Sequence, residues 1–159
     1  MPASPFEIFV GPNQTPSAQV LLQDPSGGGA VGGTAIFDTG AAYTLASEKL
    51  FSSLFSGAAL PPKHISTAGG GAAHTKPGRE LLFTLTLSRG LTKFDVSFLA
   101  PVWPHLGIHP GYNMDLLIGC DLLRMIKLAF VGSHSKKVAV RSSKLLVYPA
   151  KDWAEIQRP

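Results

Sequence analysis

Apolar and polar residues alternate in several short runs of the chain, which is the pattern of β-strands with one buried face. Every second residue of Leu81–Leu87 is leucine or phenylalanine, and Lys93–Ala100 alternates Phe94, Val96 and Phe98 with other residues. These two runs are predicted to be neighbouring strands. The same reasoning predicts strands over Phe6–Val10, Ala18–Gln23, Gly33–Phe37, Tyr43–Leu45, Ile65–Thr67, Met114–Ile118, Leu128–Val131, Val138–Val140 and Leu145–Tyr148.

Helical spacing of apolar residues is limited to short segments. Ser47 can cap a helix over Glu48–Phe55, in which leucine and phenylalanine each recur at helical spacing. Asp121 can cap a second helix over Leu122–Lys127. Trp153–Pro159 is expected to form a weak helix or a loose tail.

The 17 glycines and 13 prolines divide these elements with many turns. Asp24–Gly29 is expected to be the flexible turn of a hairpin, and Pro101–Gly111 is expected to be irregular. Ala68–Ala73 has almost no side chain to pack, so a mobile loop or the tip of a hairpin is expected there. Many short strands with one or two short helices predict an all-β fold, either a closed barrel or a sandwich.

Composition indicates a single folded domain. The chain has 159 residues, of which 45% are apolar and 15% are charged, as in globular proteins rather than disordered ones. No apolar run approaches the ~20 residues that a membrane-spanning helix needs, so no membrane partner is expected. Met1–Val10 lacks the pattern of a signal peptide, and the single cysteine, Cys120, excludes an internal disulfide. These features predict a reducing, cytoplasmic location.

Charged and metal-binding residue types narrow the function further. The formal net charge is +4, and Lys136, Lys137, Arg141 and Lys144 form a basic stretch. A solvated basic surface is preferred, and a nucleic-acid-binding β-barrel is kept as an alternative that predicts salt-sensitive binding. The five histidines lack metal-site spacing, so no metal and no cofactor are expected. Cys120 is expected to be a small buried hydrophobe, because no base lies near it in the sequence.

The most informative stretch is Ile36-Phe37-Asp38-Thr39-Gly40-Ala41. The apolar residues before Asp38 predict a buried strand that carries this carboxylate to the end of a sheet. Gly40 allows a sharp turn and a close approach of the backbone to another group. A carboxylate is costly to bury unless something uses it, so Asp38 is a candidate functional residue. The tripeptide alone leaves a plain strand-end turn open as the alternative.

Three segments resemble, in the same order, the retropepsin-like aspartic proteases of retroviruses and LTR retrotransposons. Asp38–Ala41, followed by Thr44-Leu45, is similar to the catalytic turn of that family. Ile65–Leu87, with its glycines and its predicted strand, is similar to the segment that carries the flap. Asp115–Leu123 is similar to the second signature, in which two apolar residues and a glycine lead into a helix. The resemblance covers Val20–Val131.

The resemblance implies a closed, barrel-like retropepsin fold, a single lobe that completes its site as a homodimer. It places the protease domain in residues 1–150 and a C-terminal tail in residues 151–159. Peptide hydrolysis by this route needs two carboxylates and one water: one carboxylate accepts a proton from the water, and the other donates a proton to the carbonyl oxygen. The chain has one Asp-Thr-Gly, so two copies related by a twofold axis must each contribute an Asp38.

The resemblance also implies roles for the residues around Asp38. Thr39 would hydrogen-bond to the turn of the second copy and keep the two carboxylates coplanar, and Gly40 and Ala41 would complete the turn. Phe37 would belong to the core. The flap that closes over a peptide would contain Ala68, Gly69, Gly70, Gly71 and Ala72. The residues that support the turn would be Leu117, Ile118 and Gly119.

Two positions depart from the family's pattern. Many retroviral enzymes carry an aspartate four residues after the catalytic one and an arginine just after the second-signature glycine, and these two residues pair. Ala42 and Cys120 occupy those positions here, so that ion pair is absent. In the family, chain termini interleave in a sheet that holds the dimer, and the sequence leaves open whether Phe6–Val10 or Leu145–Tyr148 does so.

These observations predict a homodimeric aspartic endopeptidase that processes a retrotransposon polyprotein at extended, mainly apolar sites. The alternative is a catalytically silent, host-captured retropepsin fold that acts as a dimerisation or peptide-binding module. The intact Asp38-Thr39-Gly40 favours catalysis, because only catalysis requires a shared pair of carboxylates.

Overall fold

The computed structural model describes residues 5–10, 15–25, 27, 29–47, 49–50, 52, 62–66, 75–79, 81–89, 92–103, 114–132 and 143–148. The main sheet has six strands in the order β4 (Leu45–Ala46), β9 (Leu116–Ile118), β3 (Ala30–Phe37), β2 (Ser17–Gln23), β7 (Leu81–Arg89) and β8 (Thr92–Val102). A second sheet has the order β1 (Phe6–Val10), β11 (Ser143–Tyr148) and β10 (Lys127–Gly132). A separate hairpin joins β5 (Pro62–Ser66) to β6 (Thr75–Arg79), and helix α2 (Cys120–Leu123) lies between β9 and β10.

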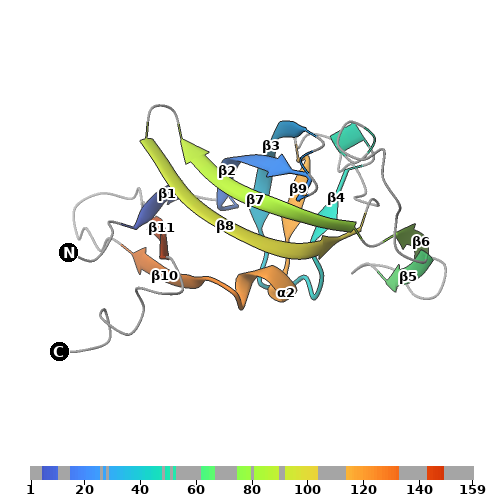
Figure 1. Cartoon of the computed structure of the whole chain (residues 1–159). Helices are drawn as coiled ribbons and strands as arrows, with labels where there is room; N and C mark the ends of the chain where they lie inside the picture. Colours follow the sequence, from blue (N-terminus) through green and yellow to red (C-terminus); the bar gives the residue numbers. More distant parts are fainter. Residues whose placement is uncertain are drawn as a thin grey trace.

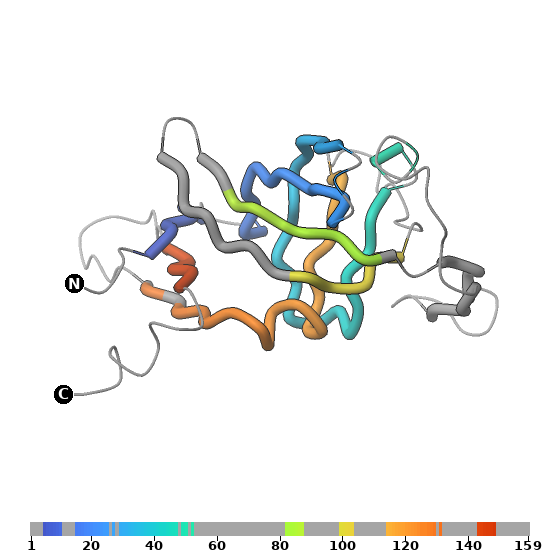
Figure 2. The backbone as a smooth tube through the Cα atoms, in the orientation of Figure 1, coloured from blue at the N-terminus to red at the C-terminus, as the bar shows by residue number. Residues whose placement is uncertain are grey.

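The described residues are mostly β-strand with almost no helix, and the main sheet curves into a nearly closed barrel (Figure 1). The predicted all-β class is therefore confirmed. Strands β7 and β8 run side by side across the other strands of this sheet (Figure 2). They are neighbours, as predicted, and pair antiparallel with a register shift between Leu85 and Leu87. A bulge of this kind bends and twists a strand pair, which helps a sheet to curl over its core.

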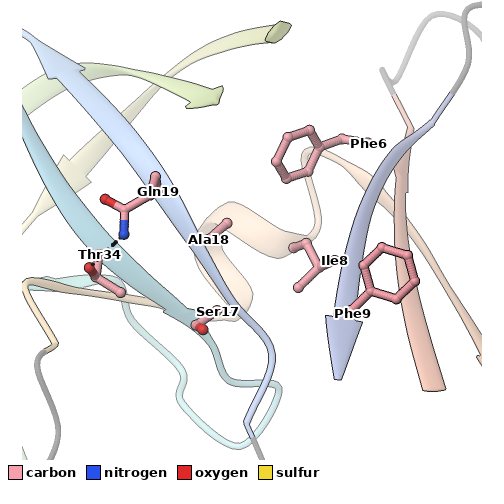
Figure 3. Close-up of a pocket in the computed structure, with 7 residues that line it drawn as sticks. All are labelled: Phe6, Ile8, Phe9, Ser17, Ala18, Gln19 and Thr34. Carbon is pink, nitrogen blue, oxygen red and sulfur yellow. Dashed lines mark hydrogen bonds between the residues drawn. The ribbon is translucent and has the colours of Figure 1, made fainter. Parts of the chain in front are cut away.

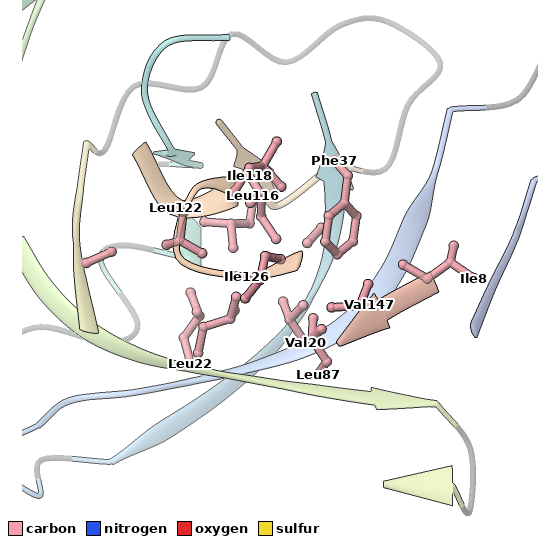
Figure 4. Close-up of a cluster of buried hydrophobic side chains, with 14 of the residues drawn as sticks. Ile8, Val20, Leu22, Phe37, Leu87, Leu116, Ile118, Leu122, Ile126 and Val147 are labelled. Carbon is pink, nitrogen blue, oxygen red and sulfur yellow. The ribbon is translucent and has the colours of Figure 1, made fainter. Parts of the chain in front are cut away.

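The core is one cluster of apolar side chains enclosed by both larger sheets and α2 (Figure 4). It shows the alternation expected of half-buried strands, since Phe83, Leu85 and Leu87 of β7 are fully buried and Leu82 is exposed. Phe37 is also buried, as predicted. Fully buried side chains also come from distant elements: Leu22, Val102, Leu116, Ile118, Leu122, Leu145 and Val147.

Several element boundaries differ from the sequence prediction: β4 and β9 begin two residues later than expected, β5 begins and ends earlier, β3 begins earlier, and β6 was not predicted. Two further differences have a clear physical reason. Pro101 was expected in an irregular segment, but β8 continues through it to Val102. Because β8 is at the edge of the main sheet, it can hold a proline, which central strands rarely do. The helix predicted over Leu122–Lys127 instead spans Cys120–Leu123, because Lys127 already belongs to β10. Its N-cap is Gly119, so the prediction of Asp121 as the cap is wrong.

The cap predicted for the other helix is confirmed. The Leu50 N–H donates to Ser47 Oγ at 3.2 Å, which is the bond of an N-cap residue. Within the described residues, no helix is long and apolar enough to span a membrane. The strand predicted over Val138–Val140, the tail Trp153–Pro159 and the glycine-rich Ala68–Ala73 lie outside the described residues.

The second sheet joins segments from both ends of the described chain. β1 pairs antiparallel with β11 from Phe6↔Val147 to Val10↔Ser143, and β11 also pairs with β10. Both segments named as candidates for an interleaved dimer sheet therefore pair within one chain. Their inward side chains join the core, since Phe6, Ile8, Leu145 and Val147 are buried.

The predicted hairpin between β2 and β3 is confirmed, and its turn depends on glycine. Gly27 and Gly29 have positive φ angles of 87° and 122°, which cost an L-residue roughly 1 kcal/mol or more. We expect Gly29→Ala to lower the free energy of unfolding by about 1 kcal/mol, measured by urea denaturation. Gly32→Ala is the matched control, because its Cβ would meet only Val20 O at 3.8 Å. Equal stability of the two variants would contradict the strain at Gly29.

Candidate active site

Asp38 follows the last residue of β3, the strand at the centre of the site. Phe37 is in parallel register with Ile118 of β9, and the Asp38 N–H continues this ladder by donating to Ile118 O at 3.0 Å. On the other edge of β3, the Phe37 N–H donates to Pro16 O at 3.0 Å. The strand is thus held on both sides up to the residue that carries the carboxylate. The side chain of Asp38 emerges half-buried at the end of the sheet.

The turn after Asp38 holds its carboxylate with a backbone donor. The Gly40 N–H donates to Asp38 Oδ1 at 2.8 Å, and the Ala41 N–H donates to Asp38 O at 3.3 Å. Thr39 and Gly40 are exposed. A Cβ at Gly40 would lie 3.1 Å from Asp38 Oδ1, whereas only Gly27 and Gly29 among the described glycines have positive φ. A side chain at position 40 would therefore press on the carboxylate, which would have to shift by a few tenths of an ångström, and the backbone of Gly40 is not left-handed.

The segment after β9 is bonded directly to this turn. The Cys120 N–H donates to Ala41 O at 2.8 Å, and the Asp121 N–H donates to Ala42 O at 3.2 Å. The turn and the start of α2 therefore form one bonded unit, although they are far apart in the sequence (Figure 1). Leu117 is in register with Ile36 of β3 and Leu45 of β4. The structure thus brings Asp38–Ala41 together with the predicted supporting residues Leu117, Ile118 and Gly119.

Gly119 lies against the backbone of Tyr43. A Cβ added to Gly119 would overlap the Tyr43 carbonyl group and lie 2.9 Å from Tyr43 N. No other amino acid fits there without moving the turn, because backbone atoms cannot rotate away as a flexible side chain can.

Tyr43 itself is half exposed, and its ring packs on buried Trp103 with centroids 5.3 Å apart. Trp103 thus packs in the interior beneath the segment that follows the turn.

Cys120 is exposed, so the prediction of a small buried hydrophobe is wrong. The residue is at the first position of α2, where its N–H points to Ala41 O and its side chain points toward the turn. The thiol donates to Thr39 O at 3.2 Å. Sequence spacing could not show this contact, because it joins residues 81 positions apart.

A polar pair behind the turn, buried Thr44 with partly buried Asp121, was missed by sequence reasoning. Thr44 is fully buried, and its hydroxyl donates to Asp121 Oδ1 at 2.7 Å. The same hydroxyl accepts from the Gly119 N–H at 3.2 Å. A threonine within the apolar run before β4 was the one sequence signal, because a buried hydroxyl needs a partner.

A cavity of about 270 Å³ lies between β1 on one side and β2 and β3 on the other (Figure 3). Its lining includes apolar side chains of β1 and polar ones of the facing strands, where Gln19 Nε2 donates to Thr34 Oγ1 at 3.1 Å. No residue of the Asp38 turn lines it. The full lining is Phe6, Ile8, Phe9, Ser17, Ala18, Gln19 and Thr34.

The predicted flap falls between two paired strands. β5 and β6 are antiparallel from Pro62↔Arg79 to Ser66↔Thr75, so they form a hairpin around residues 67–74. Ala68, Gly69, Gly70, Gly71 and Ala72 belong to that connection and lie outside the described residues. The hairpin projects at the opposite side of the molecule from the β1–β11–β10 sheet (Figure 1).

Comparison with known proteins does not assign the chain to a family. No protein-family model matches it, and no curated protein sequence matches it. Among the residues that the structure describes, no three His, Cys, Asp or Glu side chains gather into a metal site. Function must therefore be inferred from the Asp38 turn itself.

One basic residue of the C-terminal stretch is described. Lys144 Nζ lies 3.0 Å from Glu7 Oε2 and 4.9 Å from the centre of the Phe9 ring. Its ammonium group thus contacts Glu7 and Phe9 on the surface of the β1–β11–β10 sheet. Lys136, Lys137 and Arg141 lie outside the described residues, so binding of nucleic acid stays an untested alternative.

Proposed function

We propose that this protein is a retropepsin-like aspartic endopeptidase that acts as a homodimer and hydrolyses peptide bonds. The observation that carries the proposal is the setting of Asp38, a half-buried carboxylate on an exposed turn at the end of a central strand. This turn is bonded to the segment of the second signature through Ile118, Cys120 and Asp121. The two most informative motifs of the sequence therefore meet in space.

A second copy of the chain is needed because one carboxylate cannot serve as acid and base at once. The nearby aspartates have other partners: Asp115 Oδ2 accepts from the Thr34 N–H, and Asp121 Oδ1 accepts from Thr44. Among the described residues, no hydrogen bond joins either to Asp38. The Thr39 side chain is exposed and makes no hydrogen bond to any of the described residues. Its hydroxyl is thus available to the turn of a second copy.

The proposed reaction places one water between the two Asp38 carboxylates, which share a single proton. The ionised carboxylate takes a proton from the water as the water oxygen attacks the peptide carbonyl carbon, and the protonated carboxylate donates to the carbonyl oxygen. The first carboxylate then gives its proton to the amide nitrogen while the second takes one back from the tetrahedral intermediate, so the C–N bond breaks and the amine and acid products leave. The Gly40 N–H orients Asp38 by binding Oδ1 at 2.8 Å. The β5–β6 hairpin is proposed to close over an extended peptide. A retrotransposon polyprotein is the proposed substrate.

Purified protein is expected to cleave members of a panel of extended, mainly apolar peptides at mildly acid pH. A statine-containing inhibitor of the pepstatin type should block this cleavage, because its hydroxyl replaces the water between two carboxylates. Inhibitors of serine, cysteine and metalloproteases serve as controls and should have no effect. A dimer by light scattering that cleaves no peptide at any pH would contradict the proposal and favour the silent binding module.

A further inference from the structure

The buried Thr44 hydroxyl has a fixed direction of hydrogen bonding. The Gly119 N–H can only donate, so Thr44 Oγ1 accepts from it at 3.2 Å. The hydroxyl proton must then point to Asp121 Oδ1, 2.7 Å away, and a carboxylate oxygen accepts it. Asp121 Oδ1 also accepts from the Leu122 N–H at 2.8 Å. The chain of donors and acceptors therefore runs in one direction, from Gly119 through Thr44 to Asp121.

This chain of bonds crosses the two segments that form the candidate site. Thr44 belongs to the segment after Asp38, whereas Gly119 and Asp121 flank the first residue of α2. Gly119 directly follows Ile118, whose carbonyl accepts from the Asp38 N–H. The Asp121 N–H binds Ala42 O at 3.2 Å, so this residue contacts the turn through both its backbone and its side chain.

A role in starting α2 explains only one bond of the Asp121 side chain, the one that Oδ1 accepts from the Leu122 N–H. The cap of that helix is Gly119, and a helix of four residues gains little from an acidic first turn. Asp121 Oδ2 is buried and has no hydrogen-bond partner among the described residues. A buried oxygen without a partner lowers the stability of the fold, so the bonds of Oδ1 must offset that cost. The side-chain partner of Oδ1 is Thr44.

We propose that Asp121 and Thr44 form a positioning pair that sets the place of the Asp38 turn relative to β9. Neither side chain touches the reacting atoms; they act through the backbone of residues 41–44 and 118–121. The inference rests on the proposed function. Displacement of a reacting group by about 1 Å can lower the rate of a positioned reaction by about 100-fold. A pair that links these two segments is therefore expected to affect kcat more than KM.

Thr44→Val tests the pair, because valine keeps the shape of threonine and removes the hydroxyl. We expect kcat on a peptide cleaved by the wild-type protein to fall about tenfold or more, with KM within about twofold. Thr44→Ser restores the hydroxyl and should recover most of kcat. Asp121→Ala should resemble Thr44→Val, and the double variant should lose little more than either single one, because both break the same contact.

Val147→Ala in β11 is the control for a purely structural role. Val147 is fully buried in the core on another sheet, and its truncation should lower stability without moving the turn. Equal losses of kcat in Val147→Ala and Thr44→Val at matched melting temperatures would overturn the proposal. So would an unchanged kcat in Thr44→Val, or additive losses in the double variant.

Amide hydrogen exchange of Gly119, followed by NMR, tests the pair without any substrate. Its exchange should be faster in Thr44→Val and in Asp121→Ala than in wild type and Thr44→Ser. If the wild-type protein cleaved nothing, the proposed function would fail, whereas these exchange rates would still report on the bond. Unchanged exchange in both variants would overturn the pair itself.

Discussion

Asp38→Asn is expected to abolish peptide hydrolysis and to leave the fold and the dimer intact. Asparagine has the shape of aspartate and keeps an oxygen to accept from the Gly40 N–H, which lies 2.8 Å from Asp38 Oδ1. It cannot take a proton from water, so the rate should fall by about 10³-fold or more. The same peptide assay measures the loss, and light scattering measures the dimer. Full activity of this variant would exclude Asp38 from the chemistry.

Mixing the variant with wild-type protein tests whether the site is shared between two chains. If each site needs an Asp38 from both copies, mixed dimers are inactive, and an equimolar mixture at equilibrium should keep about one quarter of the activity of an all-wild-type sample at the same total concentration. Independent sites would instead keep about one half. A wild-type sample diluted twofold with buffer controls for dissociation of the dimer.

Gly119→Ala is expected to be among the most damaging single changes outside the Asp38 turn. The added Cβ would overlap the carbonyl group of Tyr43, which is backbone and cannot turn away. Overlap of this kind in a packed region costs about 3 kcal/mol or more unless the turn moves. If the turn moves instead, the bond from the Gly119 N–H to Thr44 Oγ1 is lost. Either the free energy of unfolding, measured by urea denaturation, or the rate in the peptide assay should therefore fall strongly.

Gly32→Ala is the control for the loss of a glycine as such. A Cβ at Gly32 meets one backbone oxygen at an ordinary contact distance of 3.8 Å. This variant should keep wild-type stability and activity. If Gly119→Ala were equally silent, the close packing of Gly119 on Tyr43 would be wrong.

The sequence predicted those parts of the fold that depend on local pattern. Alternation placed β7 beside β8, the apolar run before Asp38 predicted β3, and Ser47 was correctly expected to cap a helix. These features follow from the spacing of side chains along a few residues, which burial of one face dictates. The position of Asp38 at the end of a strand was predictable for the same reason.

The parts that could not be predicted depend on contacts between distant segments. Cys120 looked like a core residue from its type, but the turn fixes it at an exposed position. Asp121 looked like a helix cap, and its partner Thr44 lies 77 positions away. Pro101 ended a predicted strand, and only its place at a sheet edge makes it acceptable within β8. No local pattern carries this information.

The pairing of β1 with β11 has a consequence for the timing of biosynthesis. Ser143 Oγ donates to Val10 O across 133 positions of sequence, and Leu145 and Val147 of β11 fill the core. A ribosome must therefore release almost the whole domain before its core can close. Until then β1 lacks its neighbouring strand, and the core lacks Leu145 and Val147. If the proposed activity holds and the chain is made as part of a polyprotein, cleavage by this domain has to wait until the domain itself has been synthesised.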